Sequence, residues 1–340
     1  MSELRFEVII AGTTPPPAFA AVRGLPGEPE ALVVPGTRCL IAWSAEVPRA
    51  RATLVVRDDL HGAAGPTGMI GHYEACDADA GVAVLRAAAG VLAGEGATGV
   101  LGPMNGSTWH RYRLALPSAV DDPVWDPPNF GGEPRNPFEY PAHFAAAGFD
   151  VVARYESHAD DLTATGVADA HDAMALADRV AAAGFSLRPI DLSRFAEEIE
   201  TLWDLSRAAF ADNLYYAPIE AAEFRAMYEP LRSHIDPELV SIALDRDERP
   251  CGYLFAFPDP LAVRDGVPRR LVVKTVAVLP GARGHGLANH MLDRVRWSAR
   301  RRGCDTLIHA LMHVENFSMR MSARHGGQLF RRYALWQWKP

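Results

Sequence analysis

The stretch that decides the fold is residues 271–291, Leu-Val-Val-Lys-Thr-Val-Ala-Val-Leu-Pro-Gly-Ala-Arg-Gly-His-Gly-Leu-Ala-Asn-His-Met. Its first nine residues are mostly β-branched or apolar, which predicts a buried strand over 271–279. Pro280 and Gly281 end that strand. Leu287, Met291 and Val295 then recur at helical spacing. The stretch therefore predicts a strand, a glycine-rich turn and a helix.

The turn between this strand and helix is suited to bind an anion. The first amides of a helix have no partner inside the helix, and they lie at the positive end of its dipole. Gly284 and Gly286 allow an anion to approach the bare backbone, and Arg283 adds a positive charge beside it. We expect a phosphate or pyrophosphate here. The alternative is a tight turn whose glycines serve packing alone.

Two common phosphate motifs do not fit the turn. A P-loop would need Gly-Lys-Ser or Gly-Lys-Thr to close it, and a dinucleotide fold would need G-x-G-x-x-G. Residues 283–288 instead match R-x-x-G-x-A. With the preceding 276–280, Val-Ala-Val-Leu-Pro, this pattern resembles the acyl-CoA-binding signature of the GNAT superfamily of N-acetyltransferases. The resemblance implies that acetyl-CoA, or another acyl-CoA, is the co-substrate and that no metal takes part.

The elements expected over 186–340 follow the order β-α-α-β-β-β-α-β-α-β, which is similar to the GNAT fold. Asn316 stands where many family members place an asparagine that contacts the pantetheine arm. The tyrosine that usually protonates the leaving thiolate in the family falls on Ala323, which is a departure. The resemblance implies cofactor binding by Val276, Ala277, Val278, Arg283, Gly284, His285, Gly286, Leu287, Ala288 and Asn316.

The first half of the chain resembles a second copy of the same unit. Residues 144–149 are similar to the family's helix-glycine-phenylalanine ending, and 103–107 echo the sequence that begins at Asn316. The phosphate turn is different, because Asp77 and Asp79 would repel a pyrophosphate. We therefore expect an α/β fold with a mixed sheet, built from two tandem GNAT-like domains. The alternative for the first half is an unrelated α/β domain.

The expected organisation has three parts. Residues 1–160 form a degenerate GNAT-like domain without a cofactor site, 161–185 a linker helix, and 186–340 the N-acetyltransferase domain. The predicted function is transfer of an acyl group from acetyl-CoA to the amine of a small molecule. The alternative is an inactive module that binds or senses acyl-CoA.

Candidates for proton transfer lie on the strands around the turn. His309 lies within the strand expected over 306–312 and His313 just beyond it, and each has the alternative of a satisfied or exposed histidine. Tyr333 is the nearest tyrosine on the closing strand and has packing as its alternative. Lys274 alternates with the two valines of the 276–278 segment, so we expect its amine on their side. It could bind an acidic acceptor or the acyl oxygen, or pair with a buried carboxylate.

Composition excludes several classes of function. The 340 residues carry a formal net charge of −8, and the longest basic run is three arginines at 300–302, so no nucleic-acid partner is expected. The four cysteines form no C-x-x-C and are expected to be reduced thiols. No segment reaches the ~18 apolar residues of a membrane span, so a soluble cytoplasmic monomer or homodimer is expected.

Overall fold

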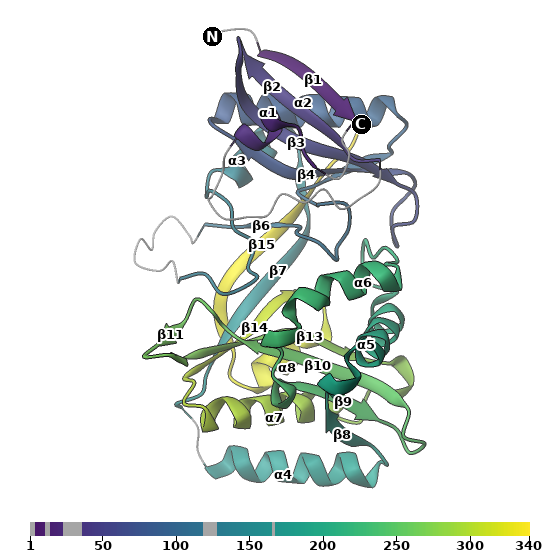
Figure 1. The fold of residues 1–340 in the computed structure, drawn as a ribbon, viewed down its shortest axis with the longest axis vertical. Coiled ribbons are helices and arrows are strands. Elements are labelled where there is room, and N and C mark those ends of the chain that lie inside the picture. The colour runs from purple at the N-terminus through teal and green to yellow at the C-terminus, as the bar shows by residue number, and fades with distance from the viewer. Residues whose placement is uncertain (1–3, 11–13, 23–35, 118–127, 165–166) are drawn as a thin grey trace.

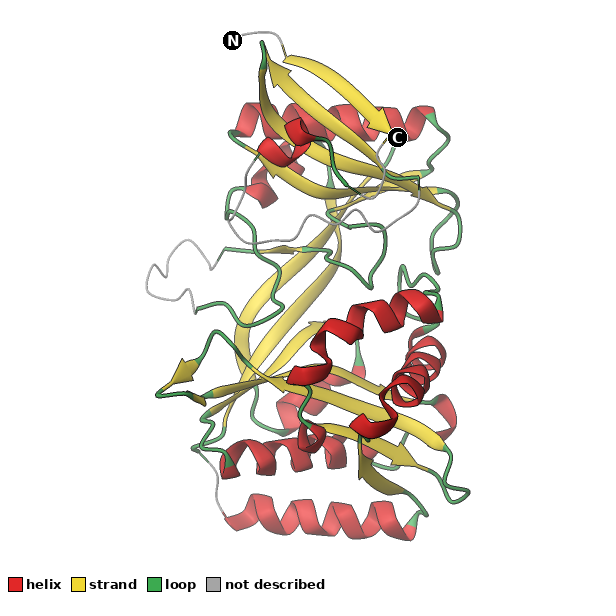
Figure 2. Ribbon diagram, viewed as in Figure 1, coloured by secondary structure: helices red, strands yellow, loops and turns green. Residues whose placement is uncertain are grey.

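The computed structural model describes residues 4–10, 14–22, 36–117, 128–164 and 167–340. Its main feature is a mixed sheet of thirteen strands with helices on both faces, beside a small two-stranded sheet (Figures 1 and 2). This architecture confirms the α/β fold class with a mixed sheet.

The first half of the chain supplies one end of the large sheet. Its elements are β1 (Leu4–Ile10), α1 (Pro17–Ala21), β2 (Arg38–Ser44), β3 (Val47–Arg57), β4 (Thr67–Ala75), α2 (Ala78–Gly94), β5 (Gly99–Gly102), β6 (Leu114–Ala115), α3 (Tyr140–Ala146) and β7 (Asp150–Asp161). Strands β1 to β4 form an antiparallel meander, and α2 connects β4 to the parallel strand β5.

The second half repeats this arrangement at the other end. Its elements are α4 (Val167–Ala182), β8 (Ser186–Pro189), α5 (Phe195–Phe210), α6 (Ala221–Tyr228), β9 (Val240–Leu244), β10 (Pro250–Pro258), β11 (Val263–Arg264), β12 (Val267–Pro268), β13 (Arg270–Val278), α7 (Leu287–Arg301), β14 (Thr306–His313), α8 (Phe317–Arg324) and β15 (Gln328–Trp338). Strands β8, β9, β10 and β13 are antiparallel, and α7 connects β13 to the parallel strand β14.

Two long strands join the halves by crossing over in the middle of the sheet. Strand β7 of the first half pairs with β14 of the second, and the C-terminal strand β15 pairs with β5 of the first half. The two strands also pair with each other, and in Figure 1 they run side by side between the two ends of the molecule. The domain division expected from the sequence stays a prediction, and these strands cross it.

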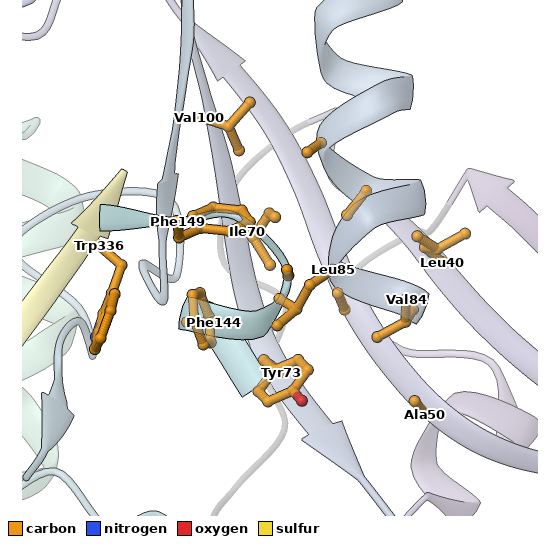
Figure 3. Close-up of a cluster of buried hydrophobic side chains, with 14 of the residues drawn as sticks. Leu40, Ala50, Ile70, Tyr73, Val84, Leu85, Val100, Phe144, Phe149 and Trp336 are labelled. Carbon is orange, nitrogen blue, oxygen red and sulfur yellow. The ribbon is translucent and has the colours of Figure 1, made fainter. Parts of the chain in front are cut away.

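Separate hydrophobic cores cover the faces of the sheet. In the first half α2 and α3 pack on the sheet, and Trp336 from the C-terminal strand joins that core (Figure 3). In the second half α4 and α7 cover one face, while α5 and α6 cover the other. Strands β10 and β13 therefore lie between these two layers of helices, because both strands contribute residues to both cores.

The expected helices and strands correspond to those observed, with a few differences. The strand expected over 149–155 continues to Asp161, and the hairpin β11–β12 and the short β6 were not anticipated. The long loop expected over 106–141 includes 118–127, which lie outside the described residues. Among the described residues, no helix is long and apolar enough to cross a membrane.

Candidate acyl-CoA site

The site begins where two parallel strands diverge. The pairing of β13 with β14 runs from Arg270 opposite Thr306 to Val273 opposite His309, and then it stops. Beyond that point residues 274–278 keep β10 as a neighbour on one edge only. The backbone groups on the other edge of 276–278 therefore face a wedge between the strands. The three residues of this segment are among those expected to bind the cofactor.

The turn after β13 leaves the N-terminus of α7 uncapped. Gly284 and Gly286 have φ angles of +87° and +85°, the left-handed region that favours glycine. Gly286 is the N-cap of α7 and offers no side chain to bond the first amides of the helix. A Cβ at Gly284 would meet nothing within 4 Å, so the space in front of this backbone is open. The turn has the free amides and the room that an anion needs.

Arg283 folds back onto the turn. Its Nε donates to the carbonyl oxygen of Val278 at 3.0 Å, and its Nη2 donates to that of Ala209 at 3.1 Å. The side chain therefore ties the turn to the ends of β13 and α5 and keeps its positive charge there. The neighbouring His285 is exposed, and its ring lies 5.1 Å from that of Phe185.

The remaining residues expected to bind the cofactor flank the same turn. Leu287 is buried and Ala288 half-buried, and both pack into the core beneath α7. Helix α4, expected to be a linker without a role in the site, packs here too, because a Cβ on Gly286 would meet Leu176 at 2.7 Å. Asn316 is the exposed N-cap of α8, and its side chain makes no capping hydrogen bond.

Lys274 does not lie on the side of the strand that was expected. The register between β10 and β13 shifts at this position, because Phe255 pairs with Thr275 while Ala256 pairs with Val273. The bulge leaves Lys274 unpaired and turns its side chain away from the valines, toward α6. Its Nζ donates to Tyr228 Oη at 2.7 Å and lies 4.5 Å from the centre of that ring. Burial of the ammonium lowers the pKa of Lys274, although the residue as a whole is exposed.

Tyr333 and His309 lie inside the protein. The hydroxyl of Tyr333 donates to Glu133 Oε1, and burial, followed by the charge of Glu133, raises the pKa of the tyrosine. His309 is 1% exposed, its Nδ1 lies 2.8 Å from Ser322 Oγ, and burial lowers its pKa to about 3. Both side chains are enclosed, so the structure argues against either of them as a direct proton donor or acceptor for a substrate.

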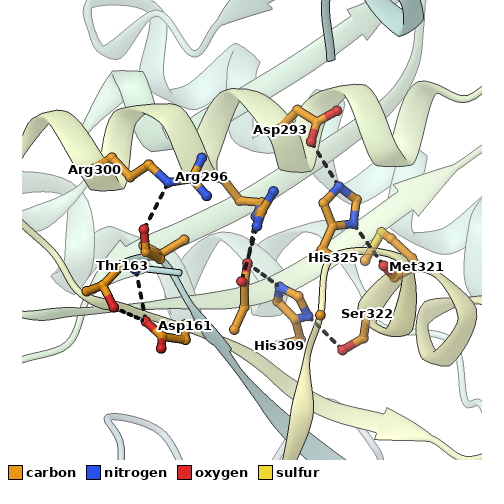
Figure 4. A network of polar contacts seen from close by, with 12 residues as sticks. Asp161, Thr163, Asp293, Arg296, Arg300, His309, Met321, Ser322 and His325 are labelled. Carbon is orange, nitrogen blue, oxygen red and sulfur yellow. Dashed lines mark hydrogen bonds and ion pairs between the residues drawn. The ribbon is translucent and has the colours of Figure 1, made fainter. Parts of the chain in front are cut away.

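The enclosed histidine belongs to a polar network that holds α7 and α8 to the sheet (Figure 4). Asp160 on β7 accepts hydrogen bonds from Arg296 on α7, at 2.7 Å from Nε and 3.2 Å from Nη2. His325 lies 2.9 Å from Asp293 on the same helix. The network therefore joins the strand contributed by the first half to the helix that follows the turn.

His313, the other candidate for proton transfer, lies at the end of β14. Burial is the main cause that lowers the pKa of His313, and the nearby charge of Arg113 lowers it further. Its Nδ1 accepts a hydrogen bond from the Glu315 amide at 3.2 Å. A neutral ring in this arrangement carries its proton on Nε2. The ring packs edge-on against Tyr155, at 5.1 Å between centres.

The corresponding turn in the first half is already occupied by a carboxylate. Asp77 is the N-cap of α2, and its Oδ1 accepts a hydrogen bond from the Ala80 amide at 2.8 Å. Its Oδ2 accepts a second bond from Arg49 at 2.6 Å. The bond to the backbone and then the bond to Arg49 lower the pKa of Asp77, so this carboxylate is ionised at neutral pH. It occupies the helix end where a phosphate would otherwise bind.

This difference predicts one acyl-CoA site per chain. Calorimetric titration of the protein with acetyl-CoA should give a stoichiometry close to one, because Asp77 blocks the second helix end by charge and by its hydrogen bonds. Two equivalent sites would contradict this assignment. Asp77→Ser, which keeps a capping oxygen and removes the charge, is the control for the effect of the carboxylate.

Sequence reasoning missed the residues that the first half contributes near the wedge. The guanidinium of Arg113 stacks on Tyr112 and Tyr155, 3.8 Å and 4.2 Å from the ring centres. Its Nη1 donates to the carbonyl oxygen of Leu311 on β14 at 3.0 Å. These residues carry no motif, and Arg113 lies 198 positions from Leu311. No local signal in the sequence could have connected them. Within the described part of the chain, no group of histidine, cysteine or acidic residues has the arrangement of a metal site.

Comparison with known proteins supports a relationship to acetyltransferases. The acetyltransferase (GNAT) family profile matches residues 199–326. A bacterial ceramide synthase from Caulobacter vibrioides is 29% identical over 162 residues, which are 46% of this chain and 38% of that protein. The match therefore spans less than half the length of this relative.

Several solved structures share the fold over 98% of this chain. A tandem GNAT protein from the clavulanic acid biosynthesis pathway has a TM-score of 0.52 at 15% identity and is covered over 98% of its length. A GCN5-related N-acetyltransferase from Sphaerobacter thermophilus has a TM-score of 0.52 at 14% identity, with 95% covered. A probable N-acyltransferase from Enterococcus faecalis has a TM-score of 0.59 at 11% identity, with 73% covered. At these identities the likeness is one of fold.

Proposed function

We propose that this chain, whose residues 199–326 match the acetyltransferase (GNAT) family, transfers an acetyl group from acetyl-CoA to the amine of a small molecule. The observation that supports the proposal most strongly is the uncapped end of α7 beside the wedge between β13 and β14. A ligand that extends from the turn into this wedge would place a phosphate and a thioester at the two ends of one site. Acyl-CoA has that shape and chemistry.

In the proposed reaction the chain binds and orients both substrates. The free amides of the turn at Gly284 and Gly286 hold the pyrophosphate, and Asn316 contacts the pantetheine arm. Acetyl-CoA supplies the thioester. The amine nitrogen attacks the thioester carbonyl carbon, the carbon–sulfur bond breaks, and CoA leaves as a thiolate while the amine gives up a proton to water. Backbone amides of the 276–278 segment stabilise the negative charge that develops on the carbonyl oxygen.

A turnover assay tests this proposal. The protein should release free CoA from acetyl-CoA only when a suitable small amine is present, and mass spectrometry should find the acetylated amine. Because of the partial match to a bacterial ceramide synthase, palmitoyl-CoA belongs beside acetyl-CoA in the donor panel. Acetyl-CoA binding without turnover on any amine would instead support the inactive acyl-CoA-binding module. Failure to bind either donor would overturn both.

A further inference from the structure

Lys274 is a cation without a carboxylate partner in the part of the chain that the structure describes. Apart from Lys339 it is the only lysine in the sequence. The bulge in β13 aims it toward Tyr228, whose hydroxyl accepts one of its three N–H bonds. The ammonium also lies 5.8 Å from the centre of the Phe255 ring. Among the described residues, no ion pair involves Lys274, so the alternative of a buried carboxylate partner finds no support there.

Arg113 is a second cation for which the described residues provide no ion pair. It is 8% exposed and held by the carbonyl of Leu311 and by two tyrosine rings. Its Nε makes no hydrogen bond, and no ion pair to it is found in the part of the chain that the structure describes. Burying a cation without an anion is costly, because the aromatic rings and one carbonyl replace only part of its hydration.

Three of the other buried arginines of this protein show a contrast, because each binds a carboxylate that is itself buried. A fourth, Arg51, donates to the carbonyl oxygen of Phe19 at 2.9 Å. The three pairs are Arg270 with Asp259, Arg296 with Asp160, and Arg331 with Glu133. Arg113 and Lys274 depart from this pattern, in a chain whose formal net charge is −8. An anion from outside the chain would complete the pattern seen in the three arginine–carboxylate pairs.

Both cations are attached to strand segments that begin where the parallel pairing of β13 with β14 ends. The parallel pairing of β13 with β14 ends at Val273 and His309. Lys274 is the next residue on β13, and Arg113 bonds to Leu311, the second residue beyond that end on β14. The charge of Arg113 also reaches His313 at the end of β14, where it helps to lower the pKa of that histidine.

We propose that the acceptor amine carries a carboxylate, which is bound by the ammonium of Lys274 with the buried guanidinium of Arg113 as the second positive charge. The acceptor is then an amino acid or a related amino-carboxylate, and the first half of the chain takes part in selecting it. This inference rests on the proposed acetyltransferase function. Lys274 can give the carboxylate the N–H bonds that Tyr228 leaves free, and such charge-assisted bonds are stronger than neutral ones.

The test uses matched pairs of acceptors that differ only in the carboxylate. Tyrosine with tyramine, leucine with isopentylamine, and alanine with ethylamine cover three sizes of side chain. For the wild type, kcat/KM should be higher for the carboxylate member of at least one pair. Lys274→Met should raise KM for that amino acid at least ~10-fold, and Arg113→Met at least ~3-fold, with little change in kcat. Both variants should change KM for the matched amine less than about threefold.

The controls separate this inference from the proposed function. Lys339→Met and Arg249→Met remove exposed cations elsewhere and should leave every KM unchanged. Acetyl-CoA affinity, measured by calorimetry, reports on the proposed function alone and should be the same in all four variants. A wild type that prefers neither member of any pair, or the amine in every pair, overturns the inference. In Lys274→Met and Arg113→Met, KM could instead rise equally for the amino acid and for its matched amine. That result would assign the two residues a structural role and would overturn the inference as well.

Discussion

Replacing Asp160 by asparagine should lower the free energy of unfolding by about 3–5 kcal/mol. The carboxylate of Asp160 and the guanidinium of Arg296 are 2% and 9% exposed, and two hydrogen bonds join them. The substitution keeps the shape of the side chain but leaves Arg296 buried without its counter-ion. Chemical denaturation followed by circular dichroism measures the loss. The effect should be large because the pair joins β7 of the first half to α7 of the second.

The neighbouring residue provides the matched control. Asp161 is exposed and its carboxylate accepts hydrogen bonds from Thr163, so Asp161→Asn should cost no more than about 1 kcal/mol. The double variant Asp160→Leu with Arg296→Met removes both charges and should recover most of the loss. A free energy of unfolding for Asp160→Asn within about 1 kcal/mol of the wild-type value would show that this pair contributes little to holding the halves together.

Local sequence patterns predict much of this fold, and long-range pairing explains most of what they miss. The strand over 271–279 and the helix after it follow from apolar periodicity and from Pro280, Gly281 and the later glycines, which are all neighbours in the chain. The crossing of β7 and β15 leaves no such mark. A strand has the same alternation of residues whether it pairs within its own half or with the other half.

The candidate site likewise has features that local sequence predicts and features that depend on long-range pairing. The turn at 283–288 could be predicted, because the backbone conformation and the anion-binding end of a helix depend on residues next to one another. The direction of Lys274 was predicted wrongly, since a bulge in β13 depends on its register with β10. Tyr333 was expected to donate a proton or to pack, and no local pattern could reveal that its hydroxyl bonds to Glu133, 200 residues earlier.

The largest effect on ligand binding is expected at the phosphate turn. Arg283→Glu should weaken acetyl-CoA binding at least ~100-fold, equivalent to about 2.7 kcal/mol. The change removes a positive charge beside the free amides of α7 and puts a negative one in its place. It also breaks the bonds to Val278 and Ala209 that tie the turn in place. Calorimetry with acetyl-CoA gives the affinity, and the denaturation midpoint shows whether the protein stays folded.

Substitutions of two glycines in the same turn separate the effect of backbone conformation on binding from the effect of charge. A Cβ on Gly281 or on Gly284 would meet nothing within 4 Å, but only Gly284 has a positive φ, of +87°. Forcing alanine into that region costs about 1–2 kcal/mol, so Gly284→Ala should disturb the turn and weaken binding about tenfold. Gly281→Ala should bind acetyl-CoA as the wild type does. If Arg283→Glu stays folded and keeps its affinity, and the two alanine variants behave alike, then the anion does not bind at this turn and the proposed function loses its strongest support.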